Sequence, residues 1–145
     1  MVKVCFICTG NTCRSIMAER LLKRMMKERK IENIKVSSKG ICARGDNIAE
    51  NAKIVLKKHK ALASNRKSVK LGKIDKETLY IVMTESMKSF VKAPLLLSMK
   101  DLMGNDIPDP YGLSEEEYEN TACLLNKGIV RLLEKINLWR EVWLF

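Results

Sequence analysis

The sequence predicts one α/β domain spanning residues 1–145, with a mainly parallel sheet covered by helices on both faces. Its 145 residues fit one domain of ordinary size and are enough to bury a core. Short apolar runs of strand length alternate with segments of helical period, which is the pattern of a parallel sheet with crossover helices. No internal repeat, linker or low-complexity tract divides the chain.

The N-terminal part of the chain predicts a strand, a helix and a second strand. Val2–Cys8 is an apolar run and is expected to form a buried strand. From Ser15 onwards, apolar residues recur at helical spacing, and Glu19 is expected on the opposite, polar face of this helix. Residues 33–37 predict the second strand. The unit is therefore a βαβ crossover, which we expect to be right-handed.

The middle of the chain continues this alternation. Apolar residues from Ile48 to Leu56 predict a second helix that closes near His59. Residues 78–83 predict the next strand, and residues 85–91 a short helix. Ligands of such sheets bind beyond the carboxyl ends of the strands, where the loop after the first strand also lies.

The C-terminal part predicts a short edge strand at 95–98 and a loop rich in helix breakers at 104–112. A long final helix is expected from there to about Leu138, opened by a capping box of Ser114 and Glu117. The apolar tail LWREVWLF, which begins at Leu138, is expected either to pack on the core or to serve as a contact surface, and we favour packing.

The composition favours anionic partners. The formal net charge is +10, and such a field attracts nucleic acid, acidic membrane surfaces or phosphorylated substrates. The other interpretation is a solvated basic surface without a specific partner. Zinc-finger spacing and an aromatic-rich RNA-binding signature are both missing from the sequence, which disfavours nucleic acid.

The sequence predicts a cytoplasmic protein. No apolar run approaches the roughly 20 residues of a membrane span, and the start lacks the features of a signal peptide. The five cysteines are expected to be reduced in that compartment, and their odd number argues against a paired disulfide framework.

The segment CTGNTCRS, from Cys8 to Ser15, predicts an anion site. Gly10 and Asn11 tolerate the positive φ angles of a tight loop, and the helix that follows points unpaired N–H groups into it. Arg14 adds a planar fork that can hold two phosphate oxygens. The same positive field stabilises a thiolate on Cys8, which could then attack phosphorus and form a cysteinyl-phosphate. The alternative for Cys8 is a small buried apolar residue at a strand end.

Asp109 is the predicted general acid. It lies between Pro108 and Pro110, which fix the backbone on both sides of the carboxyl group. A leaving group needs a proton, and the attacking water then needs a base. The alternative role of Asp109 is that of a turn aspartate. His59 is the only histidine, and its place at a helix end favours an interaction with the helix dipole over catalysis.

These residues resemble a known family. The run VCFICTGNTCRS followed by MAE, together with a later DPYG, is similar to the low-molecular-weight protein tyrosine phosphatases over nearly the whole chain. The resemblance implies a four-stranded parallel sheet flanked by helices, a two-step mechanism, no cofactor and no metal. It implies a phosphorylated protein as substrate and, in our interpretation, a monomeric enzyme. Cys8 is then the nucleophile, Arg14 the phosphate clamp, and Asp109 the acid and later the base.

The resemblance also assigns supporting residues. The phosphate-binding loop comprises Thr9, Gly10, Asn11, Thr12, Cys13 and Ser15. Of these, Asn11 and Ser15 resemble the polar residues that brace the loop, as does Ser38, and Tyr111 resembles the aromatic wall of the substrate crevice. The loop also suggests that peroxide joins Cys8 and Cys13 in a reversible disulfide, a pairing that the resemblance supports.

The chain departs from the family pattern at four positions. Ile16 stands where proline is usual, and Asn65 lies where a histidine often supports the loop. Arg44 is expected where many members place an aromatic on the second crevice wall. Thr12 occupies a position that is usually aliphatic in tyrosine-specific members, and it resembles the branch that acts on phosphoarginine. The interpretation is therefore phosphotyrosine-type hydrolysis, with phosphoarginine as the alternative.

Two rival functions remain open. Arsenate reductases share this loop and fold but need further redox cysteines, and only Cys42 and Cys123 lie downstream, far apart in sequence. A basic nucleic-acid-binding module is compatible with the charge alone. Turnover of a small aryl phosphate against binding of random oligonucleotides would separate an enzyme from such a module.

Overall fold

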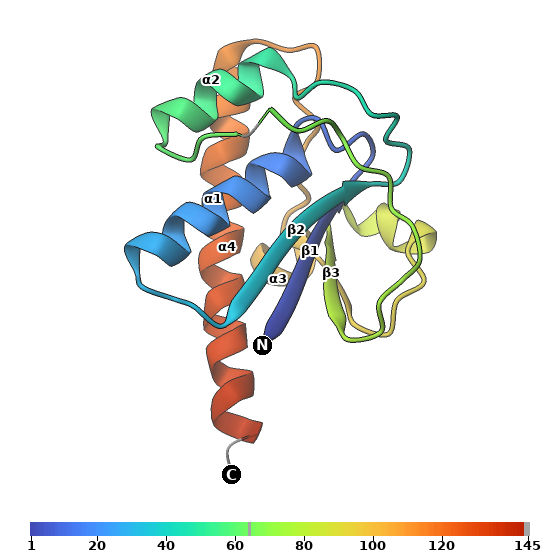
Figure 1. Cartoon of the computed structure of the whole chain (residues 1–145), viewed down its shortest axis with the longest axis vertical. Coiled ribbons are helices and arrows are strands. Elements are labelled where there is room, and N and C mark those ends of the chain that lie inside the picture. The colour runs from blue at the N-terminus through green and yellow to red at the C-terminus, as the bar shows by residue number, and fades with distance from the viewer. Residues whose placement is uncertain (64, 144–145) are drawn as a thin grey trace.

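A computed structural model describes residues 1–63 and 65–143 of the chain, with backbone only for residues 140–143. Strands and helices alternate along the described residues (Figure 1). In chain order they are β1 (Val2–Cys8), α1 (Arg14–Glu28), β2 (Ile34–Gly40), α2 (Glu50–Lys58), β3 (Thr78–Val82), the 3₁₀ helix η1 (Glu85–Phe90), β4 (Leu96–Ser98), α3 (Met99–Met103) and α4 (Glu115–Trp143).

The sheet has four parallel strands in the order β2-β1-β3-β4. The central strand β1 pairs with β2 from Val2↔Ile34 to Cys8↔Gly40, so both strands end at the same level. On its other side β1 pairs with β3. The predicted single α/β domain with a four-stranded parallel sheet is confirmed. Because all strands run the same way, the loops that follow them gather at one end of the sheet.

The two faces of the sheet are covered differently. α1 and α4 pack against each other, and the Ser38 hydroxyl on one face bonds to Glu19 of α1. Alternation along β1 puts Lys3 on the opposite face, where its ammonium binds Asp75 of the segment between α2 and β3. Tyr80, on the same face as Lys3, accepts a hydrogen bond from the Asp75 backbone N–H.

The core lies between the sheet and the helices. β1 from Val4 to Cys8 and the whole of β3 are buried, as expected for central strands of a parallel sheet. α1 and α4 contribute one apolar stripe each, with Leu21, Leu22, Leu125 and Ile129 fully buried. α4 runs along the full height of the molecule, and its C-terminal end projects beyond the sheet (Figure 1).

Three features differ from the sequence-based expectations. α3 was not predicted; Ser98 and Asp101 form a reciprocal capping box at its start. The short helix after β3 is a 3₁₀ helix. Glu19, expected on a polar face, is only 5% exposed, because it is bonded inside the molecule to Ser38.

The described apolar side chains at the C-terminal end of α4 do not pack on the core as expected. Leu138 is 58% exposed and Trp139 is 41% exposed, so neither is packed on the core. The rest of the tail lies outside the residues whose side chains are described. Within the described residues, we find no helix that is both long and apolar enough to cross a membrane.

Candidate active site

The loop between β1 and α1 lies at the carboxyl end of the sheet, pressed against the last residue of β2. A Cβ atom on Gly40 would lie 2.8 Å from the Thr9 carbonyl oxygen and 2.9 Å from the Asn11 amide nitrogen. Real side chains do not approach backbone this closely, so only glycine fits at this point. The loop is therefore supported directly by the backbone of the neighbouring strand.

Three carbonyl groups of the loop are bonded to the segment that follows β2. The amides of Ile41 and Cys42 donate to the carbonyls of Cys8 and Thr9, at 3.0 and 2.8 Å. Further on, the Ala49 amide donates to the Thr12 carbonyl at 3.0 Å. These bonds satisfy loop acceptors that would otherwise repel an anion. The N-cap of α1 has no side-chain partner, which leaves the helix N-terminus to face the loop.

Asn11 braces the loop from inside. Its φ angle is 56°, a left-handed conformation that asparagine tolerates better than most residues. Its side-chain oxygen accepts the Val69 amide at 2.9 Å. Its side-chain nitrogen donates to Ser15 Oγ at 2.8 Å and to Ser38 Oγ at 3.0 Å. Asn11 is fully buried, so these contacts fix the shape of the loop.

The Cys8 sulfur lies within this hydrogen-bonded frame. Ser15 Oγ is 2.9 Å from Cys8 Sγ, and the Asn11 amide donates to the same sulfur at 3.2 Å. Ser15 Oγ already accepts a bond from the Asn11 side chain, so its own proton is free to point at the sulfur. Two hydrogen-bonding groups thus converge on the Cys8 sulfur.

A partly buried ion pair of Glu19 and Arg66 supports the frame from behind. The Ser38 hydroxyl donates to Glu19 Oε1 at 3.0 Å and accepts from Arg66 Nη2 at 2.6 Å. Arg66 Nη2 also lies 3.4 Å from Glu19 Oε1. The pair joins α1, β2 and the segment after α2. Sequence reasoning missed both charged residues, because nothing local distinguishes them from solvated ones.

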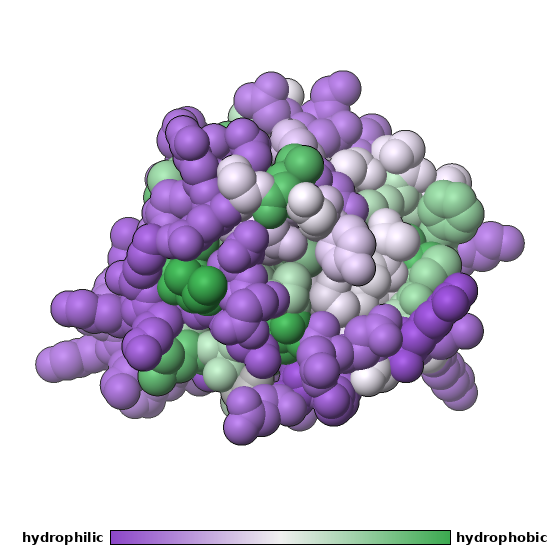
Figure 2. Space-filling model, turned by 90° about the horizontal axis from the view of Figure 1, so that it is seen from above, coloured by the Kyte–Doolittle hydropathy of each residue, from purple (hydrophilic) through white to green (hydrophobic). Residues whose placement is uncertain are grey.

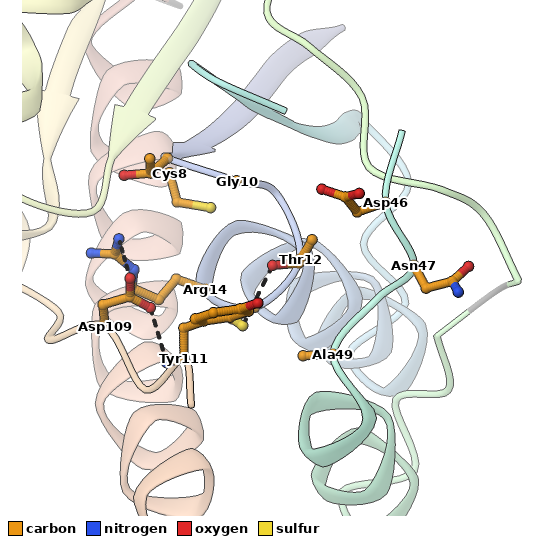
Figure 3. A pocket seen from close by; sticks show the side chains of 11 residues that line it. Cys8, Gly10, Thr12, Arg14, Asp46, Asn47, Ala49, Asp109 and Tyr111 are labelled. Atoms are coloured by element: carbon orange, nitrogen blue, oxygen red, sulfur yellow. Dashed lines mark hydrogen bonds and ion pairs between the residues drawn. The ribbon is translucent and has the colours of Figure 1, made fainter. Parts of the chain in front are cut away.

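Arg14 lies at the base of the site. Its side chain is only 5% exposed, and its guanidinium donates to the Ile107 carbonyl at 3.1 Å. Its other terminal nitrogen lies 3.6 Å from Asp109 Oδ2, while Asp109 Oδ1 accepts the Tyr111 amide at 3.1 Å (Figure 3). The loop after α3 therefore delivers a carboxylate and an aromatic ring to the same place.

Cys13 is the second thiol of the loop. It is buried, and this burial raises the pKa of the Cys13 thiol, against the opposing effect of hydrogen bonds from Tyr118 and Thr12. Its sulfur lies 3.3 Å from the Tyr118 hydroxyl of α4 and 3.6 Å from Thr12 Oγ1. Burial also raises the pKa of Tyr118. Cys13 is thus held as a neutral thiol beside the site.

A cavity of about 510 Å³ opens above the loop. Its lining contains most of the predicted site residues and several others: Cys8, Thr9, Gly10, Thr12, Cys13, Arg14, Asp46, Asn47, Ala49, Asp109 and Tyr111. Asn11, Ser15 and Ser38 are buried and act through the bonds described above. The face seen from above the carboxyl ends of the strands is mostly hydrophilic around a paler centre (Figure 2).

The comparisons with known proteins agree on one family. The family model described as low molecular weight phosphotyrosine protein phosphatase matches residues 3–141. The chain belongs to this family. It is a protein phosphatase, as the resemblance in sequence implied.

Among curated proteins, this phosphatase is similar to members with two names. It is 33% identical over 145 residues to a protein-arginine-phosphatase of Geobacillus stearothermophilus, covering 92% of this chain and 95% of that protein. It is 34% identical over 122 residues to a low molecular weight protein-tyrosine-phosphatase of Staphylococcus aureus, covering 77% of this chain and 79% of that protein.

Solved structures give the same result for the fold. The arginine phosphatase YwlE from G. stearothermophilus matches the phosphatase with a TM-score of 0.81 and 32% identity, over 97% of this chain and 96% of that one. A low molecular weight protein tyrosine phosphatase from T. tengcongensis matches with a TM-score of 0.83 and 32% identity, over 93% of this chain and 99% of that one.

The second wall of the cavity is not the expected one. Arg44 is exposed and is not among the lining residues; Asp46, Asn47 and Ala49 line the cavity there. The sequence carried a weak indication of this wall, because two polar residues, Asp46 and Asn47, follow Gly45. Gly45 has a φ of 74° and turns the chain just before them. Among the described residues that line the cavity, Tyr111 is the only aromatic one.

Proposed function

We propose that this protein phosphatase hydrolyses phosphotyrosine-type phosphomonoesters of protein substrates through a cysteinyl-phosphate on Cys8. The observation that carries the proposal is the convergence of Ser15 Oγ and the Asn11 amide on the Cys8 sulfur, at 2.9 and 3.2 Å. A thiolate held by two donors beside a buried arginine is a nucleophile aimed at a bound phosphate.

In the first step the Cys8 thiolate attacks phosphorus, and the bond from phosphorus to the leaving oxygen breaks. Arg14 and the loop amides hold the phosphate oxygens, whose charge is spread in the transition state. Asp109, which lines the cavity, donates a proton to the departing oxygen.

In the second step Asp109 takes a proton from a water molecule, which attacks the phosphocysteine. The S–P bond breaks, inorganic phosphate leaves, and the Cys8 thiolate is restored. The side chain of Asp109 is 52% exposed, which suits a group that must meet both the leaving group and water. Its place beside Arg14 keeps the carboxylate close to the phosphate in both steps.

Trapping of the intermediate tests this proposal. The enzyme is mixed with p-nitrophenyl phosphate, quenched in acid and digested, and the peptides are analysed by mass spectrometry. We expect a phosphate on Cys8 and a burst of nitrophenol equal to the enzyme concentration. Phosphate attached elsewhere, or turnover without any phosphoenzyme, would rule out the Cys8 pathway.

Phosphoarginine is a second candidate substrate, supported by Thr12. The Thr12 hydroxyl lines the cavity next to the phosphate loop, where it can accept a bond from a guanidinium N–H. An aryl ester has no such donor. The similarity to proteins named arginine phosphatases also favours this candidate. Tyr111, in contrast, offers the flat apolar surface that a phosphotyrosine ring prefers.

Three variants at one position separate the two candidates. Thr12→Ile and Thr12→Val remove the hydroxyl, whereas Thr12→Ser keeps it. If arginine is the substrate, the first two should lower phosphoarginine turnover and raise phosphotyrosine turnover, and serine should preserve the wild-type ratio. Parallel losses on both substrates, or no wild-type activity on phosphoarginine, would exclude this role of Thr12.

We infer further that the enzyme acts as a monomer in the cytoplasm and needs no metal. Every group assigned to the two steps comes from one chain, and Arg14 supplies the positive charge that the phosphate requires. The buried thiols of Cys8 and Cys13 are both free and must stay reduced for activity. Sedimentation of the active enzyme, and assays with and without a chelator, test the first and last points.

A further inference from the structure

The wall of the cavity opposite Tyr111 carries an acidic side chain. Asp46 and Asn47 both line the cavity, but they point in different directions (Figure 3). The carboxylate of Asp46 points towards the space above Gly10 and Thr12, and the amide of Asn47 points away from it. Of these two residues, Asp46 is the one placed to meet a bound substrate.

The backbone holds Asp46 firmly at this position. Ser68 is buried, and its hydroxyl accepts the Asp46 amide at 2.9 Å, while the Ser68 amide donates to the Asp46 carbonyl at 2.8 Å. Three residues further on, the Ala49 amide bonds to the Thr12 carbonyl. The segment is therefore fixed to the phosphate loop on one side and to Ser68 on the other.

The charge of Asp46 is not compensated by any of the described residues. Among the described residues, no hydrogen bond or ion pair reaches its carboxylate, although the chain carries a net charge of +10. The other two carboxylates of the site are both paired, Asp109 with Arg14 and Glu19 with Arg66. The neighbouring Lys67 bonds to the side chain of Asn47 and not to Asp46.

An unpaired carboxylate at the mouth of a phosphate site opposes the binding of a bare phosphate dianion, because like charges repel. The same carboxylate attracts a substrate that carries a positive charge close to its phosphate. In an extended peptide, the next-but-one side chain projects on the same side, roughly 7 Å away. The long aliphatic parts of lysine and arginine side chains can bridge the remaining distance to the Asp46 carboxylate.

We propose that Asp46 is a specificity-determining residue, which binds the ammonium or guanidinium group of a lysine or arginine near the phosphorylated residue of a protein substrate. This inference rests on the proposed phosphatase mechanism and adds to it the sequence context of the substrate. The basic surface of the enzyme attracts acidic proteins in general. Asp46, in contrast, selects a basic residue at the place where the substrate enters the cavity.

Matched phosphotyrosine peptides test the proposal. Two peptides are made that differ only in the next-but-one residue, lysine in one and glutamate in the other. We expect the wild type to favour the lysine peptide in kcat/KM by about threefold to fivefold, the scale of an exposed charge pair. Asp46→Asn should remove most of this preference, and Asp46→Lys should reverse it. Salt should weaken the preference.

Glu50→Gln is the control variant. Like Asp46→Asn, it removes one negative charge, but at an exposed position of α2 that does not line the cavity. It should therefore keep the wild-type preference for the lysine peptide. An equal loss of preference in this variant would mean that overall charge, and not Asp46, selects the peptide. If the wild type does not discriminate between the two peptides, the proposal is wrong.

Hydrolysis of p-nitrophenyl phosphate keeps the two proposals apart. A wild type that cleaves the aryl phosphate but treats both peptides alike contradicts the role of Asp46 and leaves the mechanism intact. A wild type that cleaves neither contradicts the mechanism itself. Thermal unfolding of each variant shows whether an equal loss on both peptides comes from misfolding, in which case Asp46 acts structurally and the specificity role fails.

Discussion

The guanidinium of Arg14 and the carboxylate of Asp109 lie 3.6 Å apart, although Arg14 is almost fully buried and the Asp109 side chain is 52% exposed. The arginine thus reaches from the core to a group on the surface loop. Its second contact, with the Ile107 carbonyl, ties it to the same loop. The proposed phosphate clamp and the proposed acid are therefore positioned together.

Arg14→Lys should lower kcat/KM by more than about tenfold, or about 1.4 kcal/mol in the barrier. A lysine ammonium cannot hold two phosphate oxygens and contact both Ile107 and Asp109 with the geometry of a planar fork. Steady-state kinetics with p-nitrophenyl phosphate measures the loss. A smaller effect would show that Arg14 is not the phosphate clamp.

Asp109→Asn should slow the hydrolysis of poor leaving groups far more than that of activated aryl phosphates. Asparagine cannot donate the proton that an alkyl or weakly acidic phenol needs on departure. A series of phenyl phosphates with graded leaving groups measures the dependence. Equal losses across the series would assign Asp109 to the structure of the turn, where it accepts the Tyr111 amide.

Cys8→Ser should abolish turnover and leave the binding of vanadate or phosphate detectable. The loop amides and Arg14 hold the anion independently of the sulfur, and a serine hydroxyl is a much weaker nucleophile here than a thiolate. Calorimetric titration with phosphate gives the affinity, and the aryl phosphate assay gives the activity. Activity close to that of the wild type would remove Cys8 from the mechanism.

Gly40→Ala should damage the site without touching a catalytic group. The added methyl would lie within 3 Å of backbone atoms of Thr9, Gly10 and Asn11, so either the loop or the end of β2 must move. We expect a destabilisation of about 1–3 kcal/mol and a loss of activity of about tenfold or more. Gly72→Ala is the matched control, because nothing lies within 4 Å of a Cβ there. Similar effects in both variants would contradict the role of Gly40.

Peroxide should join Cys8 and Cys13 in a reversible disulfide. Peroxide oxidises the Cys8 thiolate to a sulfenic acid. The Cys13 thiolate then attacks the Cys8 sulfur, the S–O bond breaks, and the departing hydroxide takes up a proton from solvent to form water. Because burial raises the pKa of Cys13, its thiolate becomes more abundant as the pH rises, so ring closure should accelerate from about pH 7 to about pH 9. Mass spectrometry of quenched samples measures the disulfide. Over-oxidised Cys8 with free Cys13 as the main product at every pH would refute the pairing.

The sequence predicted those parts of the fold that have a local signal. Val2–Cys8 was predicted with its observed bounds, because an apolar run between polar residues marks a buried strand. α3 was missed because five residues are too few to show a helical period. Its one sequence signal is the spacing of Ser98 and Asp101, which is that of a capping box. The 3₁₀ form of η1 likewise has no signature that sequence periodicity could show.

The sequence could predict those parts of the site that lie in one loop, from Cys8 to Ser15, and in one turn, around Asp109. Cys8, Arg14 and Asp109 belong to short motifs, and the structure brings them to one cavity. The ion pair of Glu19 and Arg66 was beyond sequence reasoning, because its members are far apart in the chain and look like surface charges.

The bonds that complete the phosphate loop join it to residues that lie about a hundred positions further along the chain. Cys13 contacts Tyr118 across 105 positions of sequence, and Arg14 contacts Ile107 across 93. Contacts of such separation form late and slow the folding of a domain, because a long stretch of chain must first be brought together. During synthesis, the phosphate loop leaves the ribosome long before Tyr118 of α4, the partner of Cys13, exists. A nascent chain therefore contains the Cys8 thiol before the active site around it has formed. Phosphatase activity is then a measure of complete folding.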